Sequence, residues 1–157
     1  MALSLAVLLI PVFVLVVLYK TVFSGDAPIP VKAGDTWATA RHDARFTVLE
    51  PQGLPGKWTV LSARYAGGTL RVGYVTPSGT GIQLVESDQA VDQLLPAELG
   101  ADARPGNLVP IGDRQWRAYP VARNGDRALV LADQGRTVVV IGPASDDELR
   151  TFAATLR

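Results

Sequence analysis

The chain has 157 residues, of which 48% are hydrophobic, and its formal net charge at pH 7 is zero. The fifteen basic and fifteen acidic residues are interspersed along the chain, which excludes the basic patch of a nucleic-acid-binding protein. There is no cysteine, so disulfide bonds, thiolate nucleophiles and thiolate metal sites are excluded as well.

An apolar segment opens the chain. Residues 1–19 carry no charged side chain, and the apolar run extends to residue 23 if Lys20 reaches the membrane interface. That length matches the roughly 20 residues that a helix needs to cross a bilayer, so we expect a transmembrane anchor over residues 1–23. Pro11 predicts a kink or a neighbouring helix at mid-span. The alternative is a cleavable signal peptide, which the lack of a basic region before the apolar run disfavours.

A tether and one domain are expected after the anchor. Residues 24–36 contain prolines and glycines without apolar periodicity, which indicates a tether leaving the membrane. Residues 37–157 then have about the length of one ordinary domain. Lys20 is the charge that adjoins the apolar segment, and by itself it favours a domain on the cytoplasmic side.

The first half of the domain predicts a short helix and three strands. The helix is expected over residues 37–41, with Asp35 or Thr36 as its N-cap. Alternation of apolar and polar residues predicts strands over residues 57–65, 70–74 and 82–85. One face of the first strand is expected to carry Thr59, Leu61, Ala63 and Tyr65, and the other Trp58, Val60, Ser62 and Arg64. Gly67-Gly68 predicts a two-residue hairpin turn.

A second helix and a long connection come next. The helix is expected over residues 89–95, with Ser87 or Asp88 as its N-cap and Gly100 after its end. Residues 96–114 are rich in proline and glycine and predict a connection without regular elements, the most mobile part of the domain.

Three further strands are expected over residues 115–121, 128–132 and 137–141. Asn124-Gly125 predicts a type I′ turn. The last two strands are apolar without alternation, so they should be central and covered on both faces. A C-terminal helix is the expected cover, since Ser145 and Glu148 form a capping box before an apolar stripe. The predicted class is α+β, a mainly antiparallel sheet of about six strands in βββα-βββα order with helices packed on it.

Motifs for catalysis are weak. His42 beside Asp43 would suit a general base, but a solvated helix end is the favoured interpretation because no nucleophile is placed near it. Residues 76–81 resemble a glycine-rich loop and lack every phosphate-binding signature, which indicates a hairpin turn. The acidic residues 146–148 complement a helix dipole. We therefore predict no catalytic residue, no metal and no cofactor.

Aromatic and arginine side chains provide the best candidate for a binding surface. A cleft floored by aromatic rings and rimmed by guanidinium groups would suit an acidic or glycosidic ligand or a protein partner. The alternative is a set of core aromatics with solvated arginines outside. The candidate residues are Trp58, Arg64, Arg71, Tyr74, Trp116, Arg117 and Tyr119.

Several short motifs are distinctive, and they lie at residues 3–12, 48–55, 69–77, 83–88, 116–117, 135–140 and 147–150. Together they resemble one known family, the actinobacterial domain-of-unknown-function 4245 proteins, and the resemblance covers nearly the whole chain. It implies a short protein with one membrane helix and no established activity. It also implies a basic cytoplasmic stretch before the anchor, hence an N-terminus inside and a domain outside.

Three functions follow as hypotheses. The first is a non-enzymatic, single-pass protein of the cytoplasmic membrane whose partners are the lipid bilayer and an envelope protein or envelope component. The second is an accessory subunit of a membrane complex, recognised through its kinked helix. The third is an envelope hydrolase built from His42 with Asp43 or Glu50. The element order is similar to a Mog1/PsbP-like arrangement.

Overall fold

The computed structural model describes residue 12, residues 31–133 and residues 135–157. The anchor expected over residues 1–23 and most of the tether expected over residues 24–36 lie outside these ranges, apart from the single residue Val12. Among the helices that the structure describes, none has the length and hydropathy of a membrane span.

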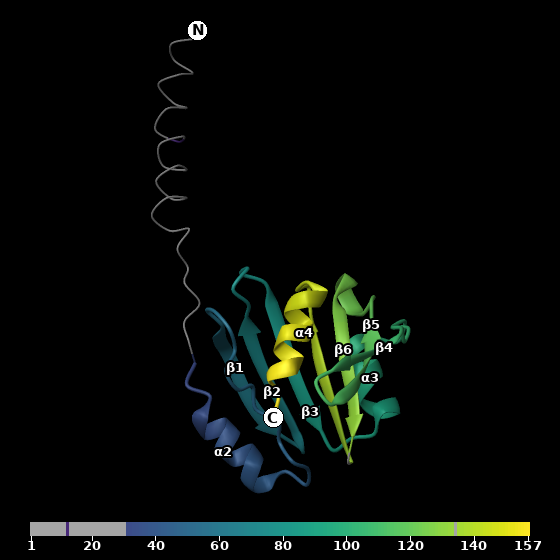
Figure 1. Ribbon diagram of the computed structural model, residues 1–157. Helices are drawn as coiled ribbons and strands as arrows, with labels where there is room; N and C mark the ends of the chain where they lie inside the picture. Colours follow the sequence, from purple (N-terminus) through teal and green to yellow (C-terminus); the bar gives the residue numbers. More distant parts are fainter. Residues whose placement is uncertain (1–11, 13–30, 134) are drawn as a thin grey trace.

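One seven-stranded antiparallel sheet organises the domain, in the order β1-β2-β3-β7-β6-β5-β4 (Figure 1). Its strands are β1 (Thr59–Ala66), β2 (Thr69–Val75), β3 (Gly81–Ser87), β4 (Leu108–Ile111), β5 (Arg114–Tyr119), β6 (Arg127–Asp133) and β7 (Arg136–Gly142). The helices are α2 (Gly34–Asp43), α3 (Val91–Leu99) and α4 (Asp146–Thr155), with a 3₁₀ turn η1 (Arg123–Gly125). The α+β class and the antiparallel sheet are confirmed.

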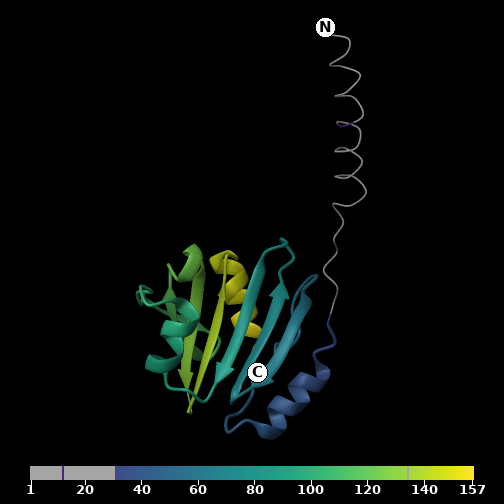
Figure 2. The same ribbon diagram turned by 180° about the vertical axis from the view of Figure 1, so that it is seen from behind.

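Helices cover the two faces of this sheet. Helix α4 lies across one face in Figure 1, and α3 lies on the other face, which Figure 2 shows from behind. Each face therefore has its own apolar cluster, one with Phe152 of α4 and one with Leu94 and Leu99 of α3. All seven residues of β7, the middle strand, are buried. The prediction that the two apolar strands are central and covered on both sides is confirmed.

Helix α4 is held by its cap and by aromatic packing. The Ser145 hydroxyl accepts a hydrogen bond from the Glu148 amide at 3.2 Å, and the Glu148 carboxylate accepts one from the Ser145 amide at 3.2 Å. The ring of Phe152 packs edge-on against Tyr74, with centroids 4.8 Å apart, and lies 5.5 Å from the ring of Trp58. The predicted capping box and apolar stripe are confirmed, and they fix α4 against β2.

The predicted strand count and helix bounds were partly wrong. The connection over residues 96–114 contains β4, which pairs with β5 at one edge of the sheet. Four residues with Pro110 among them are too few to show alternation, and an edge strand tolerates the missing amide of a proline. Helix α3 runs four residues past residue 95 because Pro96 is accommodated inside it, and α2 begins three residues before Trp37. Neither helix has a side-chain N-cap.

Two local backbone features also changed the expected pattern. A bulge between Val60 and Ser62 shifts the register of β1, so Val60 joins Ala63 and Tyr65 on the core side, against the predicted alternation. Asn124 has the expected positive φ of 58°, but it lies in η1 within a longer connection, not in a two-residue hairpin. The Gly67-Gly68 turn joins β1 to β2 with positive φ at both residues, as predicted.

Truncation of Phe152 tests the role of α4. Phe152 is fully buried between the sheet and two aromatic neighbours, so Phe152→Ala should lower the free energy of unfolding by about 3–5 kcal/mol. Urea denaturation followed by circular dichroism measures this loss. Arg150→Ala, an exposed change on the same helix, is the control and should shift stability by less than about 0.5 kcal/mol. Equal effects of the two variants would contradict the assigned packing.

Candidate functional site

The residues predicted to form one binding surface lie in different environments. Tyr74 and Trp116 expose 4% and 0% of their surface and belong to the core under α4. Trp58 is half-buried, and its indole nitrogen donates a hydrogen bond to the carbonyl of Pro55 at 2.9 Å. Of the predicted aromatics, Tyr74 and Trp58 line a common pocket, described below, whereas Trp116 lies apart from it.

The predicted arginines lie on the face of the sheet that carries α3, in two separate regions. Arg64 and Arg71 are register partners across β1 and β2, as expected from their positions around the hairpin turn. Arg117 and Tyr119 lie on β5, and Tyr119 packs against the apolar cluster that α3 covers. Arg117 is exposed and donates a hydrogen bond to the carbonyl of Gly106 at 3.1 Å. The structure thus brings Arg64 and Arg71 together and keeps Arg117 apart from them.

A polar part of the sheet remains open beside α3, where no helix covers the second face of β1 and β2 in Figure 2. We call this surface the arginine face. Its residues are Ser62, Arg64, Arg71, Gly73, Gln83 and Arg123.

Two contacts connect the arginine face to its surroundings. A guanidinium nitrogen of Arg71 donates to the carboxylate of Glu98 on α3 at 2.5 Å, and the acid is 6% exposed while the arginine is 41% exposed. Arg123, which follows β5, donates to the side-chain oxygen of Gln83 at 3.3 Å. Ser62 lies close against Gly73 in the middle of the face, because a Cβ on Gly73 would lie 2.7 Å from the Ser62 hydroxyl.

A pocket of about 350 Å³ lies on the other face, between α2, the segment before β1, and the first two strands. We call it the aromatic pocket. It is lined by Ala33, Gly34, Trp37, Glu50, Pro51, Leu54, Gly56, Trp58, Val60 and Tyr74. Three aromatic rings and one carboxylate therefore meet in an open pocket of ligand size.

A buried carboxyl group lies under the loop that precedes the aromatic pocket. Glu86 on β3 is fully buried, and its Oε2 accepts a hydrogen bond from the Leu49 amide at 2.9 Å. Burial raises the pKa of Glu86 to about 8, and the Leu49 amide and the charges of Arg136 and Arg114 oppose that rise. Its Oε1 has no partner among the described residues. The carboxyl group is therefore mainly neutral at neutral pH.

Two arginines extend this buried polar region. Arg136 on β7 is 5% exposed and donates to the carbonyl of Thr47, while its Nε has no partner in the described part of the chain. Arg114 on β5 donates to the carbonyl of Leu156 at 2.9 Å. Charged side chains of the sheet thus hold the backbone of two covering segments, the loop before β1 and the C-terminus.

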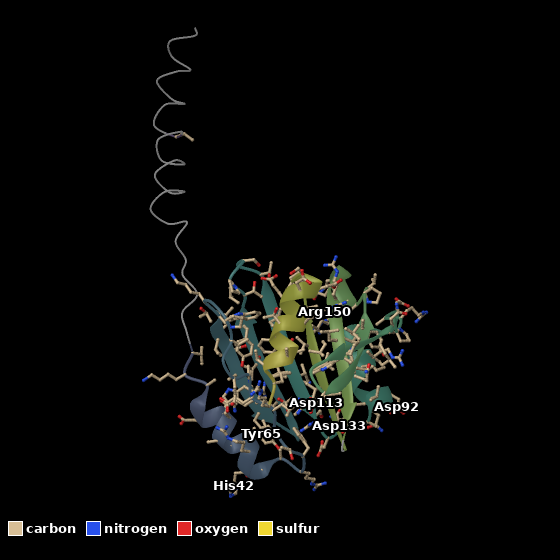
Figure 3. The ribbon with its side chains drawn as sticks, viewed as in Figure 1. His42, Tyr65, Asp92, Asp113, Asp133 and Arg150 are labelled. Carbon is tan, nitrogen blue, oxygen red and sulfur yellow. The ribbon has the colours of Figure 1, made fainter. Side chains whose placement is uncertain are left out.

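The predicted catalytic alternatives occupy exposed positions. The ring of His42 is 88% exposed at the outer end of α2 and contacts the carboxylate of Asp43 at 2.6 Å (Figure 3). Within residues 31–133 and 135–157, no three acidic or histidine side chains come together as a metal site. The acidic residues 146–148 form the first turn of α4, as predicted.

The turn between β2 and β3 has an additional structural contact. The hydroxyls of Thr76, Ser78 and Thr80 lie within 3.1 Å of one another, and Ser78 donates to the Glu148 carboxylate at 2.7 Å. The hydroxyl hydrogen bonds from Ser78 and Thr76 lower the pKa of Glu148 to about 2. Residues 76–81 therefore form a turn that is hydrogen-bonded to the cap of α4.

Sequence reasoning missed Glu86 and Arg136, although a signal was present. Glu86 shares its strand phase with Ile82 and Leu84, and Arg136 shares its phase with Val138, so both charges are in phase with a buried face. A charged residue in phase with a buried face has to find buried partners. The choice of partners depends on loops that lack periodicity, which is why the pairing was not predictable.

The fold and these surfaces define a single α+β domain with one antiparallel sheet, helices on both faces, an open polar half-face and an aromatic pocket. The family model described as "Protein of unknown function (DUF4245)" matches residues 1–156. The chain belongs to this family, which confirms the resemblance of its sequence motifs. No curated protein matches the chain, and no solved structure does.

The raised pKa of Glu86 predicts a pH-dependent stability. Because the folded pKa of about 8 exceeds the ordinary 4.5, the folded state binds the extra proton; the contribution of Glu86 to stability is complete below about pH 4.5 and is lost as pH rises towards 8. Glu86→Gln should remove this dependence of stability on pH. Its free energy of unfolding at pH 8 should exceed that of the wild type by roughly a few kcal/mol. Urea denaturation between pH 5 and about 8.5 measures the slope.

Asp102→Asn is the matched control, since Asp102 is an exposed acid in the connection after α3. It should keep the pH dependence of the wild type. The assignment to Glu86 is wrong if Glu86→Gln retains that dependence as well.

Proposed function

We propose that the protein is a membrane-anchored, non-catalytic interaction module at the outer face of the cytoplasmic membrane. The apolar residues 1–23 support the anchor, because their length suits a bilayer. The resemblance to actinobacterial single-pass proteins supports a domain outside. Helices on both faces of one antiparallel sheet also support a Mog1/PsbP-like arrangement as part of this proposal.

The observation that carries the proposal is the uncovered arginine face. The central strands are covered on both sides, whereas the second face of β1 and β2 presents Arg64 and Arg71 beside Gly73. Arginine is enriched at the energetic centres of protein interfaces, where its planar group binds carboxylates through two hydrogen bonds. A polar surface of this kind suits a partner that associates reversibly.

The charge of the arginine face specifies the partner's chemistry. Glu98 already forms a salt bridge with Arg71, and neither Arg64 nor Arg123 forms one with a carboxylate in the described ranges. Two further acids lie nearby, Asp88 at the turn where β3 ends and Asp126 at the end of η1. Two guanidinium groups of the face thus form no salt bridge in the described ranges, and the partner is an acidic segment of an envelope protein.

Site-specific crosslinking in the native host tests this surface. A photoreactive residue at Ser62 of the full-length chain should give a discrete protein adduct, whereas one at exposed Gln52, near the C-terminus of α4, should not. The double variant Arg64→Glu and Arg123→Glu should reduce the Ser62 adduct about tenfold or more, because two attractive charges become repulsive. Equal adducts from both positions, or an adduct indifferent to the charge reversal, would rule out the proposed interface.

Reporter fusions test the orientation separately. A reporter that is active outside the cytoplasm, fused after Arg157, should be active, and a cytoplasm-only reporter at the same position should be silent. The opposite pattern would place the domain inside, as Lys20 alone predicts, and would move the search for partners to the cytoplasm.

A further inference from the structure

We propose that the aromatic pocket is a binding site for an organic cation, an ammonium or guanidinium group on a small apolar body. The pocket lies on the α4 side of the sheet, and the arginine face lies on the α3 side. The two sites therefore select ligands of opposite charge on opposite faces, and this inference is independent of the proposed function.

The walls of the pocket come from three parts of the chain. Helix α2 contributes Trp37, the segment before β1 contributes Glu50 and Trp58, and β2 contributes Tyr74. Tyr74 and Trp58 are fixed by their packing against Phe152, so these two rings do not depend on a ligand for their position. A preorganised aromatic wall lowers the entropy cost of binding.

The electrostatics of the pocket favour a positive ligand. Glu50 is the carboxylate in the lining, and among the described residues no lysine, arginine or histidine lines the pocket. Burial, together with the charges of Glu50 and Glu86, raises the pKa of Tyr74, so its phenol stays neutral. The faces of aromatic rings carry negative partial charge and attract cations, and Glu50 adds a full negative charge.

The same residues disfavour other ligands. An anion would meet the carboxylate of Glu50, whose arginine partner, Arg41, stands outside the lining. A sugar needs several hydrogen-bond donors and acceptors, but the indole nitrogen of Trp58 already donates to the carbonyl of Pro55. The volume of about 350 Å³ suits one small molecule or one side chain and not a macromolecular segment.

Arg41 shows how the carboxylate of Glu50 is satisfied when no ligand is bound. Its guanidinium group donates to Glu50 at 2.5 Å from α2, and Arg41 itself does not line the pocket. The two side chains are 52% and 35% exposed, so the pair is open to competition. A ligand cation would therefore share the carboxylate of Glu50 with Arg41 or displace Arg41 from it.

Titration of the full-length chain with choline tests the proposal, with the neutral isostere 3,3-dimethylbutan-1-ol as the reference ligand. The indole N–H signals of Trp37 and Trp58 should shift saturably with choline at millimolar concentrations, while that of Trp116, which does not line the pocket, should not. N-acetylarginine amide tests the other source of a cation, a peptide side chain. Of choline and N-acetylarginine amide, the ligand that binds more tightly identifies the source of the cation.

Two variants with opposite expected effects separate binding from folding. Glu50→Gln should weaken cation binding roughly tenfold, because a charge-assisted contact is lost. Arg41→Gln should strengthen it, because the competing guanidinium group is removed. A purely structural role of this ion pair would move both variants in the same direction, and Asp102→Asn should match the wild type.

The proposal is overturned if the neutral isostere shifts the same signals with equal affinity. It is also overturned if neither cation shifts the signals of Trp37 and Trp58 in the folded wild-type protein. Thermal unfolding of every variant confirms that the comparison is made between folded chains.

Discussion

The central constraint on this structure is that β6 and β7 are apolar on both faces. A strand of this kind cannot face water on either side, so each face of the sheet requires a cover. Helix α4 supplies one cover and α3 the other, and each brings its own apolar cluster. The position of the two strands in the middle of the sheet, and the placement of the hairpins on either side of them, follow from that requirement.

The covers are smaller than the sheet, and the uncovered parts provide the two candidate sites. On the α3 side, the helix ends before β1 and β2 and leaves the arginine face exposed (Figure 2). On the α4 side, α2 and the loop before β1 complete the cover, and the space between them and the sheet is the aromatic pocket. One sheet therefore carries an arginine-bearing surface on one face and, on the other, an aromatic pocket that contains the carboxylate of Glu50.

Polar groups inside the covered region hold the loop and the C-terminus in place. Glu86, Arg136 and Arg114 each bond the backbone of a covering segment. Burying such groups costs stability unless they are fully paired, and an oxygen of Glu86 and a nitrogen of Arg136 lack partners in the described ranges. These contacts nevertheless determine where the covering loop runs, and hence the shape of the aromatic pocket beside it.

The sequence by itself determined most of the fold. The α+β class, the first hairpin, the central strands and the capped helix α4 follow from periodicity, glycine pairs and a capping box, all of which act over a few residues. It did not reveal β4, because four edge residues with a proline lack a periodic signal, or the side on which Val60 lies, because a bulge changes the phase. The family, too, was recognisable from the sequence motifs.

The tertiary structure alone decided the sites. Trp116 occupies an aromatic position of the same sequence type as Trp58 and Tyr74, yet packing buried it in the core and left the other two at the aromatic pocket. The grouping of Trp37 and Glu50 with Tyr74 joins residues far apart in the chain. Such contacts depend on the path of irregular segments over the sheet, such as the loop before β1. Irregular segments have no periodic sequence pattern, so their path cannot be predicted from the sequence.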